Sequence, residues 1–132
     1  MRFVDTNVFI YVLTKSPKRD YEIAKGILQR IEDGEEALTN VAVILELVDW
    51  LEYNNRRHEV EEMLTAINSY SAMEKAPVTW GDMLNAIDDM KKYNLDFVDA
   101  LILQTMKKYG VNEIYSNDSD FDRVDWVRRI WK

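Results

Sequence analysis

Acidic residues stand where predicted strands and helices meet, and such positions favour metal or acid–base chemistry. Asp5 follows the first apolar strand, Asp99 falls in the first turn of a helix expected over 95–110, and Asp118 follows a strand expected over 113–116. The carboxyl ends of strands in an open parallel sheet form a rim where ligands bind. Each position also has an ordinary structural explanation, because Asp residues cap helices and turns. Asp96 and Asp99 are spaced like a capping box, with Asp96 as the N-cap.

A fourth acid, Glu46, lies in an unusually apolar stretch. The helix expected over 41–54 is apolar nearly all round, so we expect it to be buried, and Glu46 is the single charge in its first two turns. A buried glutamate is rare unless it is paired or bound to a cation, since desolvating the charge is costly. We therefore expect Glu46 to have a partner and to lie near Asp5, Asp99 and Asp118.

Four carboxylates in one place predict a bound cation. They would repel and raise one another's pKa values unless divalent metal neutralised them. All-oxygen ligands favour Mg²⁺ or Mn²⁺ over zinc, and such clusters suit phosphodiester hydrolysis with one or two metals. The chain has no cysteine, which excludes disulfides, thiolate zinc sites and cysteine nucleophiles. Its one histidine, His58, stands in a charged segment and is expected to be solvated surface.

The elements that must position these acids alternate between strand and helix along the chain. Such alternation predicts crossover connections and an α/β fold, a three-layer α/β/α domain with a parallel sheet of about five short strands. We expect one domain over residues 1–132, with strands at 2–5, 37–39, 76–80, 113–116 and 127–131. Further core-facing helices are expected around 23–31, 56–70 and 83–93.

Composition limits the possible settings of this chemistry. Hydrophobic residues make up 47% of the chain, with only four glycines, which predicts a packed globule rather than disorder. The longest apolar runs are too short to cross a membrane and no signal-peptide pattern occurs, so we expect a cytoplasmic protein. A net charge of −7 opposes non-specific attraction to nucleic acid, so any such contact needs local basic patches or bound metal.

The sequence resembles the PIN-domain nucleases, and among them the small VapC-type toxin ribonucleases. The resemblance covers essentially the whole chain and rests on the order and spacing of four motifs, which are Asp5-Thr6-Asn7, Glu46 within 41–51, Asp99-Ala100-Leu101-Ile102 and Ser116-Asn117-Asp118-Ser119-Asp120-Phe121. It implies that Asp5, Glu46, Asp99 and Asp118 are the metal-site acids, supported by Asn7 and Ser116. Threonine is more usual in the family at position 116. Asp120 is a further supporting acid, and whether Asp118 acts alone or with it stays open.

The same resemblance implies Mg²⁺- or Mn²⁺-dependent endonucleolytic cleavage of RNA, an antitoxin partner and a homodimer. A haloacid-dehalogenase-type phosphatase is disfavoured because its motif needs an acid at the position of Asn7. A receiver domain lacks both its acidic pair and its lysine. The alternative that stays open is a non-catalytic or RNA-processing PIN-like module in a larger assembly, although retention of all four acids favours the nuclease.

Overall fold

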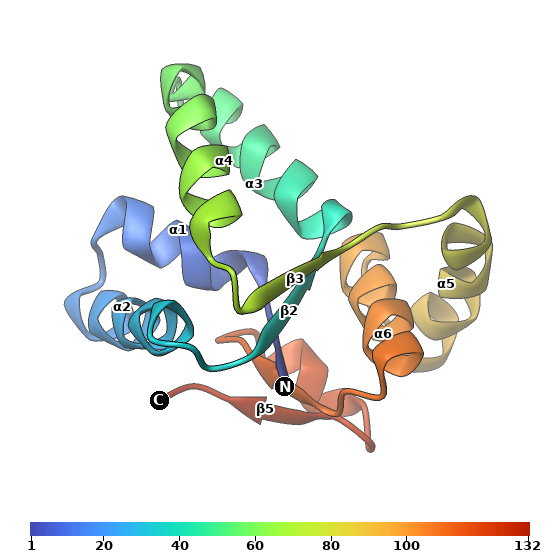
Figure 1. The fold of residues 1–132 in the computed structure, drawn as a ribbon. Coiled ribbons are helices and arrows are strands. Elements are labelled where there is room, and N and C mark those ends of the chain that lie inside the picture. Colours follow the sequence, from blue (N-terminus) through green and yellow to red (C-terminus); the bar gives the residue numbers. More distant parts are fainter.

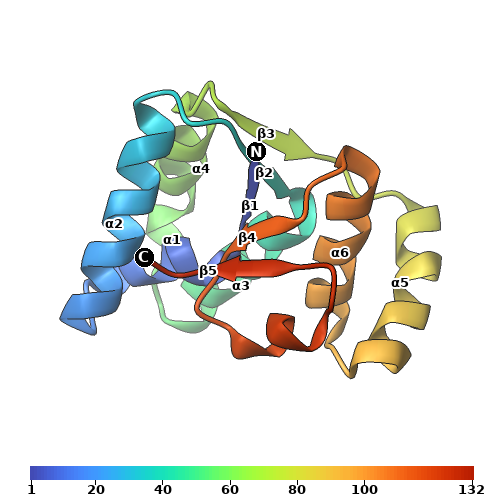
Figure 2. The same cartoon turned by 90° about the horizontal axis from the view of Figure 1, so that it is seen from below.

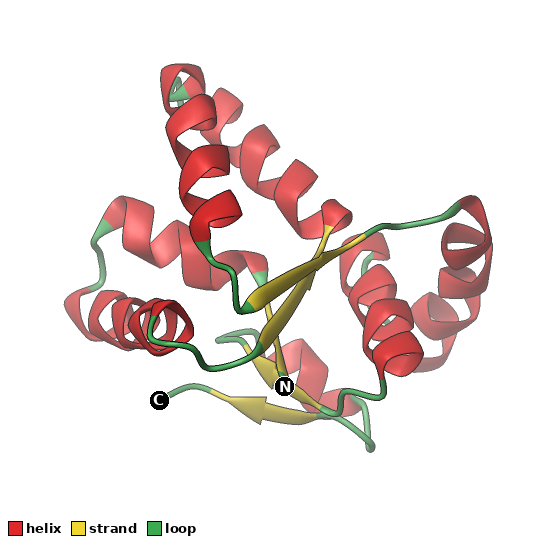
Figure 3. Ribbon diagram, in the orientation of Figure 1, coloured by secondary structure: helices red, strands yellow, loops and turns green.

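Five short parallel strands form one sheet with the order β3-β2-β1-β4-β5 (Figure 3). The computed structural model describes all residues from 1 to 132. The strands are β1 (Arg2–Val4), β2 (Ala37–Asn40), β3 (Met73–Ala76), β4 (Glu113–Tyr115) and β5 (Arg128–Ile130). The two pairings of the central strand join Phe3 to Leu38 on one side and to Ile114 on the other. The sequence therefore predicted the strand number and the parallel sheet correctly.

Six α-helices connect the strands and complete the layers. They are α1 (Thr6–Thr14), α2 (Lys18–Glu32), α3 (Val41–Tyr53), α4 (Val60–Ser69), α5 (Trp80–Tyr93) and α6 (Phe97–Tyr109), with 3₁₀ helices η1 (Arg57–Glu59) and η2 (Ser119–Arg123). Figure 1 shows α1 and α2 on one side of the sheet, α5 and α6 on the other, and α3 with α4 rising between them. None of the helices combines the length and the apolar content that a membrane span requires.

The centre of the sheet is fully apolar, and this fixes the strand ends beside the acids. Phe3, Val4 and Ile114 are completely buried in a core of 27 residues that the helices cover. Each parallel strand must then return through a helix, so the carboxyl ends of β1, β2 and β4 meet at one rim. The backbone N–H of Asp5 donates to the carbonyl of Tyr115 at 3.1 Å, which brings the segments after β1 and β4 together there.

Asn40 joins the helix that carries Glu46 to the helix that carries Asp99. Its side-chain oxygen accepts from the N–H of Val43 at 3.0 Å and so caps α3. Its amide group donates to Thr105 Oγ1 on α6 at 2.9 Å. Asn40 is completely buried, so it fixes the relative position of α3 and α6.

Helix α5 has an inverted distribution of side chains. Thr79 and Asp82 form a capping box at its start, where the sequence had suggested a strand. Asp82 and Asp89 are buried against α6, where Lys108 and Lys107 each donate to them at 2.8 Å. Large apolar side chains lie on the outside instead, namely Trp80 (73% exposed), Leu84 (54%) and Ile87 (43%).

Three expectations about the elements were wrong. Strand β3 spans Met73–Ala76 rather than 76–80, because Pro77 follows the strand and Thr79 already caps α5. The segment 56–70 begins as a 3₁₀ helix and becomes α-helical only at Val60. The helix 83–93 does not face the core throughout, since its outer apolar side chains are exposed.

Helix α3 is also not buried all round. Val41 and Leu45 are 42% and 64% exposed, whereas Val43 and Leu47 on the other face are completely buried. Helix α3 packs on α1 and α6, and these contacts leave Val41 and Leu45 exposed. From the apolar composition of α3 we therefore expected more elements to cover this helix than the structure has.

Candidate active site

Asp5 begins the site at the junction of β1 with α1. It is 4% exposed, and its Oδ1 accepts from the N–H of Thr6 at 2.7 Å, so it serves as the N-cap of α1. Its other oxygen, Oδ2, accepts from Ser116 Oγ at 2.7 Å and from Asn7 Nδ2 at 3.2 Å. The ordinary capping explanation thus holds for one oxygen of Asp5, while the other is held by polar groups that come from two elements.

Ser116 and Asn7 tie the end of β4 to the start of α1. Ser116 is completely buried, and its Oγ accepts from Asn7 Nδ2 at 3.2 Å and from the N–H of Asp118 at 3.0 Å. Asn7 Oδ1 in turn accepts from the N–H of Asn117 at 3.3 Å. The Asn117 amide continues the network to the hydroxyl of Tyr11 at 2.9 Å. These bonds fix the start of the loop that carries Asp118.

Three carboxylates come close together above this network. Oxygens of Asp99, Asp118 and Asp120 all lie within 4.8 Å of one another. Asp118 Oδ1 also accepts from the N–H of Asp120 at 2.9 Å, so it caps η2 as a turn residue would. The backbone N–H of Asp99 donates to Asp96 Oδ1 at 2.9 Å, and Asp96 is the N-cap of α6 as the sequence predicted.

Glu46 lies on the α3 side of these acids and is half-buried. Burial raises the pKa of its carboxyl group, and the charges of Asp96, Asp49 and Asp118 raise it further. The hydroxyl of Thr6 opposes this shift by favouring the charged form of Glu46. That hydroxyl is buried, yet it has no hydrogen-bond partner with normal length and angle within the chain. The chain therefore leaves one buried oxygen free beside Glu46.

Burial and the charges of neighbouring acids raise the pKa values of Asp99 and Asp5. Burial raises the pKa of Asp99 to about 9, and the charges of Asp5, Asp96, Asp118 and Glu46 contribute to this shift. Burial likewise raises the pKa of Asp5 to about 7, opposed by the hydrogen bonds from Ser116 and Thr6. Without a cation, Asp99 is thus protonated at neutral pH. The carboxylates are placed where negative charge is least stable, which is typical of a functional site rather than of helix capping.

These donors fit a hard divalent cation. Each of the close groups supplies carboxylate oxygen, the ligand type that Mg²⁺ and Mn²⁺ prefer. Mg²⁺ binds oxygen at about 2.1 Å, so oxygens around one ion lie roughly 3 to 4 Å apart. The 4.8 Å set of Asp99, Asp118 and Asp120 is within reach of that spacing, and the buried Thr6 hydroxyl lies near Glu46.

The structure brings the sequence-predicted residues to one rim but groups them differently. Asp120, expected only in support, belongs to the closest set with Asp99 and Asp118, while Asp5 and Glu46 act on that set through their charges. Asp120 also pairs with Arg123 at 3.0 Å. His58 is surface, as expected, with its side chain 77% exposed.

Sequence reasoning missed several polar residues of the rim. Thr6 and Asn117 stood inside the quoted motifs without a role, and their positions next to motif acids were the available indication. Arg129 was not assigned a role either, yet it contacts Ser116 and Asp122 directly. Its pairing with Asp122 depends on a turn whose shape the sequence does not reveal.

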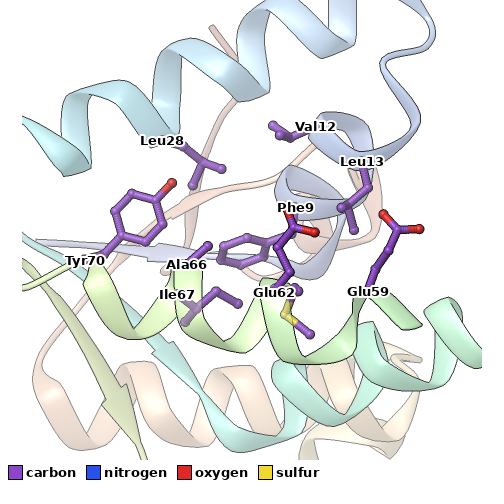
Figure 4. Close-up of a pocket in the computed structure, with 10 residues that line it drawn as sticks. Phe9, Val12, Leu13, Leu28, Glu59, Glu62, Ala66, Ile67 and Tyr70 are labelled. Atoms are coloured by element: carbon purple, nitrogen blue, oxygen red, sulfur yellow. The ribbon is translucent and has the colours of Figure 1, made fainter. Parts of the chain in front are cut away.

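One hollow lies away from the acids, and a second lies beside them. Figure 4 shows an apolar groove of about 170 Å³ between α1, α2 and α4, lined by side chains that include Phe9, Leu28 and Ile67. A second, of about 420 Å³, lies between α3, α5 and α6 and includes Glu46 together with the exposed Leu45 and Phe97. The second hollow therefore adjoins the acids, whereas the first is lined by none of the site residues.

The model of the PIN domain family matches residues 2–127. The chain belongs to the PIN-domain family. Two relatives come from Methanocaldococcus jannaschii. Ribonuclease VapC6 is 29% identical over 100 residues, which are 76% of this chain and 62% of that protein, so the chain spans less than two thirds of its length. Ribonuclease VapC2 is 30% identical over 141 aligned positions, which cover 97% of this PIN-domain chain and 91% of the relative.

Solved structures show the same PIN fold. Mycobacterium tuberculosis VapC20, described as a toxin that cleaves the sarcin-ricin loop, superposes with a TM-score of 0.79 at 21% identity, over 96% of this chain and 97% of that one. A chain of a toxin-antitoxin complex from Klebsiella pneumoniae superposes with a TM-score of 0.67 at 16% identity, over 97% and 96%. The expected three-layer PIN-like fold is confirmed.

Proposed function

We propose that this PIN-domain chain is a Mg²⁺- or Mn²⁺-dependent endoribonuclease that hydrolyses RNA phosphodiester bonds as the toxin of a toxin–antitoxin pair. Asp5, Glu46, Asp99 and Asp118 are the metal-site acids of this proposal, and Asn7, Ser116 and Asp120 support them. The observation that carries it is the environment of Asp99, a buried carboxyl group that lies close to the carboxylates of Asp118 and Asp120 and whose pKa is raised to about 9 by burial and by the charges of neighbouring acids.

The site residues have different roles, which follow from their positions. Ser116 and Asn7 hold Asp5 by one oxygen, which sets the direction of its carboxylate. Asp99 and Asp118 face each other across the gap between α6 and the loop after β4. A bound divalent ion would lower the pKa of a water molecule and offset charge on the phosphate. In the metal-free protein, burial raises the pKa values of Asp5 and Glu46, so both carboxyl groups hold a proton more readily than an exposed acid does.

Cleavage of RNA in the presence and absence of metal tests the reaction. Purified protein is incubated with total RNA and with a labelled single-stranded oligoribonucleotide, with millimolar Mn²⁺ or with EDTA. We expect cleavage only with metal, and we expect Asp99→Asn to lose most of it while keeping the fold. Asp88→Asn, which changes an exposed acid on α5, is the matched control and should cleave as the wild type does.

Cleavage that persists undiminished in EDTA would exclude the metal mechanism. Binding of RNA without cleavage, in the presence of Mn²⁺, would favour a non-catalytic binding module instead. Specific cleavage of precursor RNA alone would favour a processing enzyme over a toxin.

The proposed partner is an antitoxin protein that blocks the rim. The likeness to a chain of a toxin–antitoxin complex supports this part of the proposal. A small open reading frame next to this gene should encode it, and its co-expression should restore growth to cells that express the chain. Growth that is unaffected by expression of the chain alone would contradict the toxin role.

We also propose a cytoplasmic homodimer. Leu45 and Phe97 are exposed and line the hollow between α3, α5 and α6, and Trp80 is a further exposed apolar side chain at the start of α5; exposed apolar patches mark protein interfaces. The absence of cysteine fits a reducing compartment. Light scattering should give twice the mass of the chain at micromolar concentration, and Trp80→Glu should reduce it to that of a monomer. A monomer in the wild type would refute the dimer.

A further inference from the structure

Arg129 on β5 binds both ends of the loop that carries Asp118 and Asp120. Its Nε and Nη2 donate to the two carboxylate oxygens of Asp122 at 2.9 and 3.1 Å, and its Nη1 donates to the carbonyl of Ser116 at 3.3 Å. Ser116 and Asp122 are the first and last residues of this acidic loop, defined here as residues 116–122. Figure 2 shows β5 at the edge of the sheet, alongside the turn that η2 forms.

The other polar contacts of the acidic loop do not join its two ends. The N–H of Asp118 donates to Ser116 Oγ, and the N–H of Asp120 donates to Asp118 Oδ1, so both bonds stay within the loop. Asn117 bonds to Asn7 and Tyr11 on α1, and Asp120 pairs with Arg123, so each of these contacts holds the loop at one point only. Phe121 anchors the loop by burial but does not define its width. Arg129 is the side chain that connects the two ends, and a guanidinium does so with a planar, rigid fork.

A plain surface ion pair is the competing explanation. Exposed pairs stabilise proteins by about 1 kcal/mol or less, and the Asp122 side chain is 55% exposed. Arg129 differs from such pairs because its own side chain is only 24% exposed and because it also binds a backbone carbonyl. The hydrogen bonds with Asp122 raise the pKa of its guanidinium, and the charges of Asp122 and Asp118 raise it further, so Arg129 also acts on the rim electrostatically.

We propose that Arg129 is a positioning residue for the metal-site acids. Its fork sets the separation of Ser116 and Asp122 and thereby the direction in which Asp118 and Asp120 present their carboxylates. This inference rests on the proposed metal role of those acids.

The positioning role and a simple charge effect predict opposite results. A positive charge beside a cation site repels the cation, so removing it should raise metal affinity if Arg129 acted by charge alone. If Arg129 acts by holding the loop, its loss should lower metal affinity, and polar groups that orient metal ligands typically change affinity by about 10- to 100-fold.

Calorimetric titration of Mn²⁺ into the metal-free protein distinguishes the two. We expect Arg129→Gln and Arg129→Lys each to weaken Mn²⁺ binding by about tenfold or more, although the lysine keeps the charge. Arg128→Lys is the matched control, since Arg128 is the neighbouring residue on β5 and pairs with Glu113 at 3.0 Å with its side chain 68% exposed. It should bind Mn²⁺ as the wild type does.

Amide hydrogen exchange provides a readout that needs no metal. Arg129→Lys should accelerate exchange at residues 118 and 120, while Arg128→Lys leaves it unchanged and circular dichroism confirms that both variants fold.

Tighter Mn²⁺ binding by Arg129→Gln, or wild-type binding and exchange by Arg129→Lys, would overturn the positioning role while leaving the proposed function intact. A wild-type protein that binds no Mn²⁺ would refute the proposed function and, with it, the positioning of metal ligands.

Discussion

In the metal-free protein, Asp99→Asn should raise the free energy of unfolding, and the gain should grow as the pH rises. The pKa of Asp99 in the folded protein is raised from its ordinary value of 3.8 to about 9. Between these values the folded protein holds a proton that the unfolded chain releases. The contribution of Asp99 to the free energy of unfolding is therefore fully present below pH 3.8 and is lost progressively as the pH rises toward 9.

The size of the effect follows from the same linkage. Each pH unit within this window lowers the free energy of unfolding by about 1.4 kcal/mol per group. From about pH 5 to about pH 7, Asp99 thus removes up to about 3 kcal/mol from the wild type and nothing from the asparagine variant. That corresponds to a melting temperature that falls by roughly 10 °C more in the wild type. Asp5 adds to the slope in both proteins, until its pKa of about 7 is reached.

Thermal melts of both proteins in EDTA, at several pH values, measure this difference. Comparing the two proteins across pH removes any effect of the substitution that does not depend on pH. Asp82→Asn serves as a control of opposite sign, because the hydrogen bond from Lys108 lowers the pKa of Asp82. Asp82 contributes stability above its ordinary pKa and loses it in acid, so its asparagine variant should be less stable than the wild type at neutral pH.

Adding millimolar Mn²⁺ should reverse the comparison. Metal that binds the ionised cluster of the folded protein stabilises the wild type by mass action and the variant far less. A lower melting temperature of metal-free Asp99→Asn at all pH values, with no response of the wild type to Mn²⁺, would show that Asp99 serves only its helix. The metal-site proposal would then fail.

Three further predictions concern single side chains. Glu46→Gln keeps the shape of a half-buried side chain and removes its charge, so titration should show Mn²⁺ binding weakened about tenfold or more. Ser116→Ala removes the hydroxyl that donates to Asp5, and chemical denaturation should show a loss of about 1 to 3 kcal/mol, which Ser116→Thr avoids by keeping the hydroxyl. Leu47→Ala should lose about 2 to 5 kcal/mol because Leu47 is completely buried, whereas Leu45→Ala, on the exposed face of the same helix, should change stability by less than about 0.5 kcal/mol.

Local signals in the sequence were sufficient where one turn of chain decides the structure. Asp96 caps α6 because its side chain needs only the N–H three residues ahead. The start of α1 directly after Asp5 and the cap of α3 by Asn40 follow from the same short-range chemistry. The β-branched and aromatic residues Val78 to Trp80 misled the strand prediction, although the capping pair Thr79 and Asp82 was readable in the sequence.

Features that depend on neighbours in space could not be predicted. Periodicity marks the apolar residues of α3 and α5 but does not say how many elements will cover them, so Leu45 and Leu84 are exposed despite their type. The acids at the ends of the strands were found, yet the membership of Asp120 in the closest set depends on the turn of η2. That turn is held by Arg129, which pairs with Asp122 across seven residues of chain.

The inverted side chains of α5 make its attachment to α6 depend partly on ion pairs. Asp82, Ala86 and Asp89 are its only buried residues, and Met83 and Met90 pack on the same contact while they stay partly exposed. Lys108 and Lys107, which hold it, are about half exposed, and salt weakens such pairs. Local opening of α5 should therefore become easier as the salt concentration rises, whereas the central strands are held by buried apolar contacts. Because Ala86 packs with Ala100 and Leu101 on α6, each opening also loosens the turn that bears Asp99. The side of the acid site formed by the strand ends is thus held by the buried sheet. The side formed by α6 depends on the packing of α5, and therefore partly on the ionic strength.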